Sequence, residues 1–237
     1  MTDDRPPVPL IDRPSPNHGP RAPGSTIGLL IFHYTDMVGA EPALERLCDP
    51  ATEVSSHYFI DRAGTVYRLV AEDRRAWHAG PSSWRGQDDT NSRSIGIELD
   101  NPGHRWGYLP YPPAQMAALT ALSRWIMARH AIPPEGVVGH SDVAPRRKID
   151  PGELFDWRSL AAAGIGRWPA ALDEPAPVEP PFGREEGLRR LQRFGYEIQA
   201  PAATVEAFQR RYRPSRIDGQ LDAETLWQIA RLVPEDR

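Results

Sequence analysis

Residue types suited to metal chemistry are concentrated in one stretch, residues 139–152, with the sequence GHSDVAPRRKIDPG. His140 follows the apolar pair 137–138, which predicts the end of a strand, and Asp150 comes ten residues later, ahead of the turn signal Pro-Gly. Zinc binds imidazole nitrogen and carboxylate oxygen, and a catalytic zinc site needs three such protein ligands beside an open position. Because this stretch offers two of them, a third ligand must come from elsewhere in the chain.

Lys148 is the second unusual feature of this stretch. It is the only lysine, since the other 27 of the 28 basic residues are arginine. A compact ammonium whose pKa can be shifted differs chemically from a planar guanidinium. Its position two residues before Asp150 therefore predicts a role beside the metal. The alternative is that codon usage alone leaves one lysine at this place.

The third ligand is expected at His33, because the continuous apolar run 27–32 predicts a buried strand that ends at this histidine. The alternative is that His33 and His140 are hydrogen-bonded structural residues. Two histidines and a carboxylate would leave zinc one position for a water, whose pKa the metal lowers to about 7. Amide cleavage also needs a base and a cation for the oxyanion. Glu98 is the candidate base, and Lys148 is the candidate cation.

The remaining pattern of residues 27–167 predicts the scaffold for these side chains. Glu98 occupies one face of a strand whose other face is apolar. Strands are expected at residues 27–32, 57–61, 65–70, 94–99 and near 137–138, the second and third forming a hairpin. Helices are expected at residues 42–47, over roughly 17 residues from Pro113, and at 154–163. The fold class is therefore α/β (α+β), with a central mixed sheet of about five strands flanked by helices. Residues 1–26, proline-rich and polar, are expected to form an extended lead-in outside this domain.

A small second domain is expected after a linker. Residues 168–183 contain five prolines and predict a semi-rigid spacer that few contacts cross, so that residues 1–167 should fold alone. Residues 184–237 predict three helices. Their apolar positions are Leu188, Leu191 and Phe194; Val205, Phe208 and Tyr212; and Leu226, Ile229 and Leu232.

Composition limits the function classes. The net charge of −4 does not favour a nucleic-acid partner, and no run approaches the roughly 20 apolar residues of a membrane span. Cys48 is the only cysteine, so neither an intramolecular disulfide nor a cysteine zinc site is expected. The N-terminal residues lack the apolar core of a signal peptide, which favours the cytoplasm. The periplasm or cell envelope is the alternative, and a monomer is expected.

Six stretches in fixed order carry a resemblance to a known family. They are SPNHGPR at 15–21, HYT at 33–35, SHY at 56–58, AWHAG at 76–80, NSRSIGIEL at 91–99, and residues 139–152. In this combination the chain resembles the zinc-dependent N-acetylmuramoyl-L-alanine amidases of the AmpD/AmiD type, which are related to phage lysozyme-type amidases and peptidoglycan-recognition proteins. The resemblance extends from residue 15 to about residue 165.

This resemblance implies a site and a reaction. His33, His140 and Asp150 would hold one zinc ion, Glu98 would be the catalytic carboxylate, and Lys148 would stabilise the oxyanion. Zinc-activated water would attack the lactyl carbonyl of the amide between N-acetylmuramic acid and L-alanine, and Glu98 would pass its proton to the leaving amine.

The resemblance also implies substrate contacts. His57 would line the cleft, and Trp77 and His78 would face the sugar or the peptide. The alternative for these last two is a core tryptophan and a surface histidine. Arg85 and Arg93 are candidates for binding stem-peptide carboxylates, although surface charge explains them equally well. Asn91, by contrast, is expected to be a structural turn residue.

The C-terminal segment resembles the three-helix peptidoglycan-binding module, through VEAFQR at 205–210 and IDGQLDAETL at 217–226. Arg216 departs from that pattern, in which a small or apolar residue is common. The alternative is a helical appendage without this role. The expected partner is peptidoglycan or a muropeptide, and the sequence leaves open whether this is intact murein or soluble 1,6-anhydro-muropeptide. Two other functions stay open: a non-catalytic peptidoglycan sensor on the same fold, and a phage-type lytic endolysin.

Overall fold

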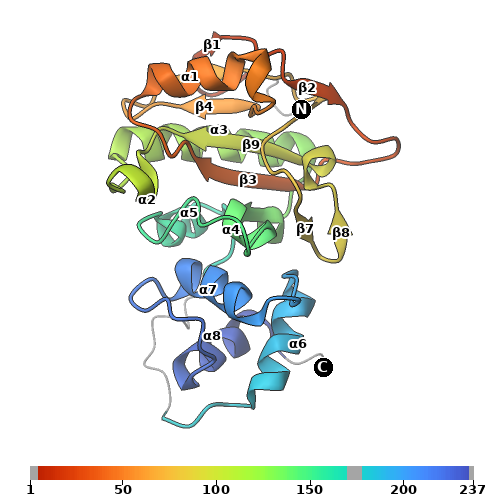
Figure 1. The fold of residues 1–237 in the computed structure, drawn as a ribbon, viewed down its shortest axis with the longest axis vertical. Helices are drawn as coiled ribbons and strands as arrows, with labels where there is room; N and C mark the ends of the chain where they lie inside the picture. The colour runs from red at the N-terminus through yellow and green to blue at the C-terminus, as the bar shows by residue number, and fades with distance from the viewer. Residues whose placement is uncertain (1–4, 170–177, 235–237) are drawn as a thin grey trace.

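A central six-stranded sheet organises the computed structural model, which describes residues 5–169 and 178–234. The strand order is β1 (Leu10–Asp12), β5 (Val66–Arg68), β4 (Tyr58–Ile60), β9 (Ser94–Leu99), β3 (Leu29–Tyr34) and β10 (Val137–Gly139). All neighbours are parallel except the predicted hairpin β4–β5. The sheet is mixed, as expected, and Figure 1 shows it from β1 at the top toward α4 below β3.

The sixth strand comes from the segment expected to lie outside the fold. In the lead-in, β1 pairs with β5, and β2 (His18–Pro20) pairs antiparallel with β6 (Arg74–Ala76). Backbone bonds from Arg13 to Arg68 and from Ser15 to Leu69 continue the first pairing. Proline removes a ladder donor and is therefore tolerated at sheet edges, which is why a proline-rich segment pairs here at the margin. The expectation of an unpaired lead-in over residues 1–26 is wrong for this part of it.

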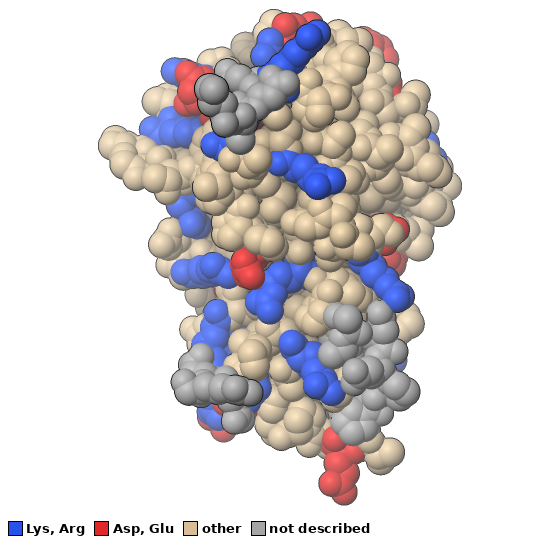
Figure 2. Space-filling view, turned by 180° about the vertical axis from the view of Figure 1, so that it is seen from behind, with Lys and Arg blue, Asp and Glu red and all other residues tan. Residues whose placement is uncertain are grey.

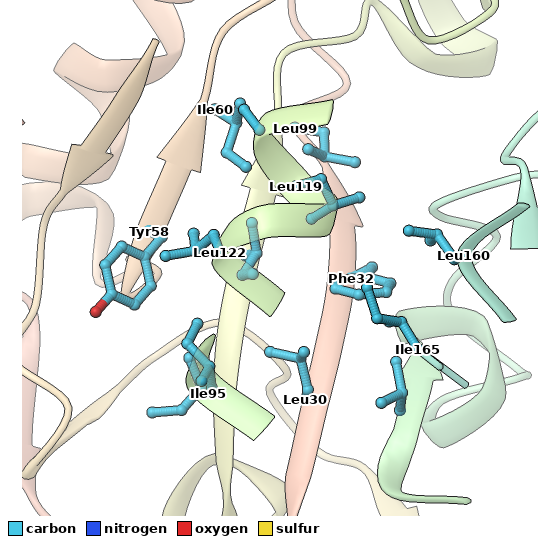
Figure 3. Packing of buried hydrophobic residues seen from close by; sticks show 14 of the residues in the cluster. Leu30, Phe32, Tyr58, Ile60, Ile95, Leu99, Leu119, Leu122, Leu160 and Ile165 are labelled. Atoms are coloured by element: carbon cyan, nitrogen blue, oxygen red, sulfur yellow. The ribbon is translucent and has the colours of Figure 1, made fainter. Parts of the chain in front are cut away.

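Helix α3 (Pro113–His130) covers one face of the sheet, and its length matches the predicted one. Leu119 and Leu122 pack on Leu30, Phe32 and strand β9, as Figure 3 shows. Helix α1 (Ala40–Cys48) lies on the opposite face, where Leu44 packs with Phe59. The two-residue period of a strand sends Leu30 and Phe32 toward α3 and leaves Ile31 and His33 on the other side. That other side carries the site.

Short elements connect this frame. They are α2 (Gly103–Trp106), α4 (His140–Val143), α5 (Trp157–Ala162), the ribbon β7 (Ser83–Trp84) with β8 (Gln87–Asp88), and 3-10 turns at Pro50–Thr52, Thr90–Arg93 and Pro134–Gly136. No helix among residues 5–169 and 178–234 is both long and apolar enough to cross a membrane.

Three C-terminal helices are present as expected: α6 (Arg184–Phe194), α7 (Pro201–Tyr212) and α8 (Ala223–Leu232). They do not stand apart from the sheet domain. Leu29, Ile31 and Val138, from the β3–β10 edge, belong to the same buried cluster as Phe208 and Tyr212. Figure 1 places α7 directly below α4, and Figure 2 shows basic side chains around the junction of the upper and lower parts.

This shared core corrects the expectation that few contacts cross the linker. The β3–β10 edge presents apolar side chains that α3 cannot reach, and the C-terminal helices bury them. Half of the predicted linker, residues 170–177, lies outside the described residues.

Candidate active site

Two parallel strands and one short helix bring the predicted chemical residues together. His33 of β3 and Glu98 of β9 are paired in register, so both point to the face away from α3. Strand β10, on the other side of β3, leads directly into α4, which begins at His140. The sequence pattern placed His140 in a loop, whereas it opens a four-residue helix. A backbone hydrogen bond from Ser141 to the Asp150 carbonyl closes the segment, at 2.9 Å, and so brings Asp150 back beside His140.

The three expected ligands converge on one point. His33 Nδ1 and His140 Nδ1 are 2.9 Å apart, and Asp150 Oδ2 lies 3.3 Å from the first and 3.0 Å from the second. All three residues are buried. Ligand atoms in a tetrahedral zinc site, with bonds of about 2.0–2.1 Å, are about 3.3 Å apart. The spacing and the donor set therefore fit a metal ion with two imidazoles and one carboxylate.

The outer nitrogens of both imidazoles are hydrogen-bonded, and for His140 the partner sets the tautomer. His140 Nε2 lies 3.0 Å from the Ala79 carbonyl, which only accepts, so this nitrogen carries the proton and Nδ1 keeps a free lone pair. His33 Nε2 lies 2.9 Å from His78 Nδ1, and His78 Nε2 lies 3.1 Å from Ser94 Oγ. Burial, and then the neighbouring His140, lower the pKa of His33 to about 4. A neutral imidazole is the form that binds metal.

A cleft of about 440 Å³ opens over this group. Glu98, Lys148, Trp77 and His78 line it together with His140 and Asp150. Glu98 is partly buried, and its Oε2 has no hydrogen-bond partner among the described residues. Burial, and then the charge of Asp150, raise the pKa of Glu98 to about 8, against the opposing effect of Lys148. A carboxylate without a structural partner, facing a cleft, is suited to proton transfer.

His57 does not line the cleft, contrary to expectation. It is fully buried beside β9, where its Nδ1 accepts the Gly96 backbone N–H at 2.9 Å and its Nε2 lies 3.1 Å from the Arg74 carbonyl. Burial and the nearby Arg21 guanidinium lower the pKa of His57 to about 3, so it is neutral. Its side chain lies on the face of the sheet that carries the site, with its ring centre 5.6 Å from that of His78, but it is buried too deeply to reach the cleft.

Arg85 is also outside the cleft. Its side chain is exposed beyond β7, and its backbone N–H donates to the Gly195 carbonyl at 2.8 Å, in the C-terminal part.

Trp77 lines the cleft, as expected, and its side chain is half-buried. His78 reaches the cleft too, but both of its ring nitrogens are engaged, one by His33. Asn91 takes a structural place, since its Oδ1 accepts the backbone N–H groups of residues 78 and 79.

Sequence reasoning missed several cleft residues, among them Tyr34, His104 and Arg147. The Tyr34 hydroxyl lies 2.9 Å from His104 Nδ1, and His104 Nε2 lies 3.1 Å from both Glu153 oxygens. Arg147 donates to the carbonyls of Ala79 and Pro81. Tyr34 follows the predicted ligand His33, and Arg147 precedes Lys148, so their positions in the sequence could have indicated that they reach the cleft. His104 gave none, because α2 is brought to the cleft only by tertiary folding.

The fold and the possible metal site are typical of one class, the N-acetylmuramoyl-L-alanine amidases, and comparison with known proteins agrees. The model of that family, Amidase_2, matches residues 23–153. The amidase AmiD of Escherichia coli is 40% identical over 223 residues, which span 84% of this chain and 79% of AmiD. The 1,6-anhydro-N-acetylmuramyl-L-alanine amidase AmpD of Enterobacter cloacae is 34% identical, over 63% of this chain and 87% of AmpD.

A solved structure extends the likeness to the C-terminal helices. The structure of E. coli AmiD with the substrate anhydro-N-acetylmuramic acid-L-Ala-D-gamma-Glu-L-Lys superposes with a TM-score of 0.79 at 38% identity, over 90% of this chain and 91% of that one. The chain therefore belongs to the N-acetylmuramoyl-L-alanine amidase family.

Proposed function

We propose that this chain is a zinc-dependent hydrolase that cleaves the amide between N-acetylmuramic acid and L-alanine, in muropeptides that include the 1,6-anhydro form. The observation that carries the proposal is the convergence of His33, His140 and Asp150 beside a cleft that His140, Asp150, Glu98 and Lys148 line. The names of AmiD and AmpD, and the ligand bound to AmiD, support the substrate class.

Each of the chain's own groups has a proposed task. Zinc, when bound by the trio, would acidify a water and polarise the scissile carbonyl. Glu98 takes the proton of the attacking water at a carboxylate oxygen and delivers it to the leaving amine nitrogen of L-alanine. Lys148 places an ammonium in the cleft, where it stabilises the negative charge that develops on the carbonyl oxygen. The half-buried face of Trp77 offers an apolar wall for the sugar ring or the peptide.

A binding-only sensor is the competing function. The complete ligand group, together with an unpartnered Glu98 carboxylate, supports the enzyme. The test is incubation of the purified protein with anhydro-muramoyl tripeptide and separation of the products by mass spectrometry. We expect free anhydro-N-acetylmuramic acid and tripeptide with wild type, and neither with Glu98→Gln. Retention of the intact ligand without cleavage would favour the sensor.

Peptidoglycan binding by the C-terminal helices and a cytoplasmic location both stay predictions. Pelleting of the full chain with purified sacculi tests the first, and fractionation of the native cells tests the second.

A further inference from the structure

The carboxylate of Asp142 lies at the junction between the sheet domain and the C-terminal helices. It is 1% exposed. Its Oδ1 accepts the Tyr196 hydroxyl at 2.5 Å, and its Oδ2 accepts Arg211 Nη1 at 3.0 Å. Tyr196 follows α6, and Arg211 belongs to the last turn of α7. Both side-chain donors to this buried charge therefore come from the C-terminal part of the chain.

The same carboxylate sets the start of the helix that carries His140. Asp142 Oδ2 accepts the backbone N–H of Gly139, the N-cap of α4, at 2.8 Å. Helix α4 has only four residues, too few to be stable by its own backbone bonds. His140 is its first residue, and the neighbouring Ser141 N–H holds the Asp150 carbonyl. A shift of α4 would consequently move two of the three metal ligands.

Arg211 reaches the strand before His140 as well. Its Nη1 donates to the Val137 carbonyl at 3.1 Å, and its guanidinium lies 3.8 Å from the centre of the Trp157 ring. The side chain is 5% exposed. Arg211 thus connects the first residue of β10 with Asp142 in α4, on either side of His140. A planar guanidinium with several donors suits this bridging position.

We propose that Arg211 and Tyr196 are positioning residues of the metal centre, and that the three C-terminal helices are a part of the active-site scaffold. They act through Asp142, which holds the α4 turn so that His140 and Asp150 meet His33. This inference rests on the proposed metal site and deepens it. Residues in the outer shell of a metal site commonly change affinity by about 10–100-fold when they are replaced.

A matched control separates this role from simple stability. Arg213 is 2% exposed and lies just after α7, but its carboxylate partners, Asp218, Asp222 and Glu224, belong to the C-terminal part itself. A second control is the pair of the exposed Arg146 and the partly buried Glu197, which spans the junction at 3.0 Å without touching Asp142. Replacing Arg213 should loosen the three helices, and replacing Glu197 should weaken an outer contact between the two parts.

The experiment measures the dissociation constant for zinc by competition with a chromogenic chelator, on full-length protein, together with the melting temperature with and without zinc. The variants are Arg211→Met, Tyr196→Phe, Arg213→Met and Glu197→Gln. We expect the first two to weaken zinc binding by about 10-fold or more. Both controls should stay within about twofold of wild type, although Arg213→Met lowers the melting temperature. Tyr196→Phe removes one hydroxyl only, and keeps the test available if Arg211→Met does not fold.

Wild-type zinc affinity in a folded Arg211→Met or Tyr196→Phe protein would overturn the inference. So would an equal loss of affinity in Arg213→Met, because the effect would then follow stability alone. A wild-type protein that binds no zinc would overturn the metal site itself, and with it the proposed function.

Discussion

Glu98 and His33 are cross-strand neighbours, in register on the parallel strands β9 and β3. Strands in a sheet lie about 4.8 Å apart, so the candidate base and a candidate metal ligand are held at a fixed separation by backbone pairing. Neither residue depends on a loop for its position. Substitutions at these positions should therefore change the chemistry without moving the strands.

Replacing Glu98 with glutamine should lower turnover by about 10²–10⁴-fold, because the amide cannot accept the water proton. Zinc content should remain near that of wild type, since Glu98 is not in the ligand group. The measurement is kcat on a defined muramoyl peptide with metal analysis alongside. Turnover near the wild-type value would rule out Glu98 as the base.

The same variant should gain stability at high pH in the metal-free protein. The pKa of Glu98 is raised to about 8 in the folded chain, above its ordinary value of about 4.3, so folding favours the protonated form. Stability is thus greatest at low pH and falls as the pH rises from about 4.3 to about 8, where the unfolded chain ionises first. Glutamine does not ionise. The melting temperature of Glu98→Gln should exceed that of wild type by several degrees at pH 8, with little difference at pH 4, which pH-dependent calorimetry measures.

Removal of the metal should abolish activity, and His140→Ala should fail to hold zinc. Wild type should carry about one zinc per chain and should melt at a higher temperature with zinc than after chelation, because a ligand that binds only the folded state stabilises it. His130→Gln serves as a control, since His130 pairs with Glu72 away from the site. Full activity in protein shown to be metal-free would contradict the mechanism.

Lys148→Arg should be strongly impaired although it keeps the charge. A guanidinium is wider than an ammonium and spreads its charge over a plane, so it cannot be directed at one oxygen in the same way. Loss of one oxyanion donor costs roughly 10²–10³ in kcat, and the arginine variant should lose most of this. Arg146→Lys, on the exposed neighbour, should leave kcat unchanged. Equal kcat in Lys148→Arg and wild type would show that the lone lysine has no special role.

Gly96→Ala should displace His78 and so disturb the candidate metal site. A Cβ at residue 96 would lie 2.5 Å from His78 Cγ, and His78 supports His33. Overpacking of this kind typically costs about 1–3 kcal/mol, and displacement of His78 should weaken zinc binding too. Gly28→Ala is the matched control, because a Cβ there meets nothing within 4 Å. Thermal melts and zinc titration of both variants measure the two losses. Equal melting temperatures and equal zinc affinities in the two variants would contradict close packing of His78 against residue 96.

Truncation after residue 167 should destabilise the sheet domain rather than leave it intact. The loss would uncover Leu29, Ile31 and Val138, which share a buried cluster with the C-terminal helices. We expect a fragment that melts well below the full chain or aggregates. If the fragment has the full chain's melting temperature and its activity on soluble muropeptide, then residues 1–167 fold alone, as the proline-rich linker predicted.

The sequence by itself predicted the three residues that the structure brings together as a possible metal site, and it predicted the main strands and helices. The run before His33 and the alternation around Glu98 follow the two-residue period of a strand, which local residue order carries. The same is true of the long helix from Pro113 and of the three C-terminal helices. Residue types and their order in the chain were also enough for the family resemblance.

Only the tertiary structure decided which side chains enter the cleft and how the two parts of the chain meet. His57 and His78 come from neighbouring motifs, yet His57 is buried against Gly96 of β9, whereas His78 reaches the cleft and contacts His33. Arg211 donates to Asp142 across 69 positions of sequence, and no local pattern encodes such a contact. The physical reason is that periodicity reports which face of an element is buried, whereas the partner that buries it is selected by packing of the whole chain.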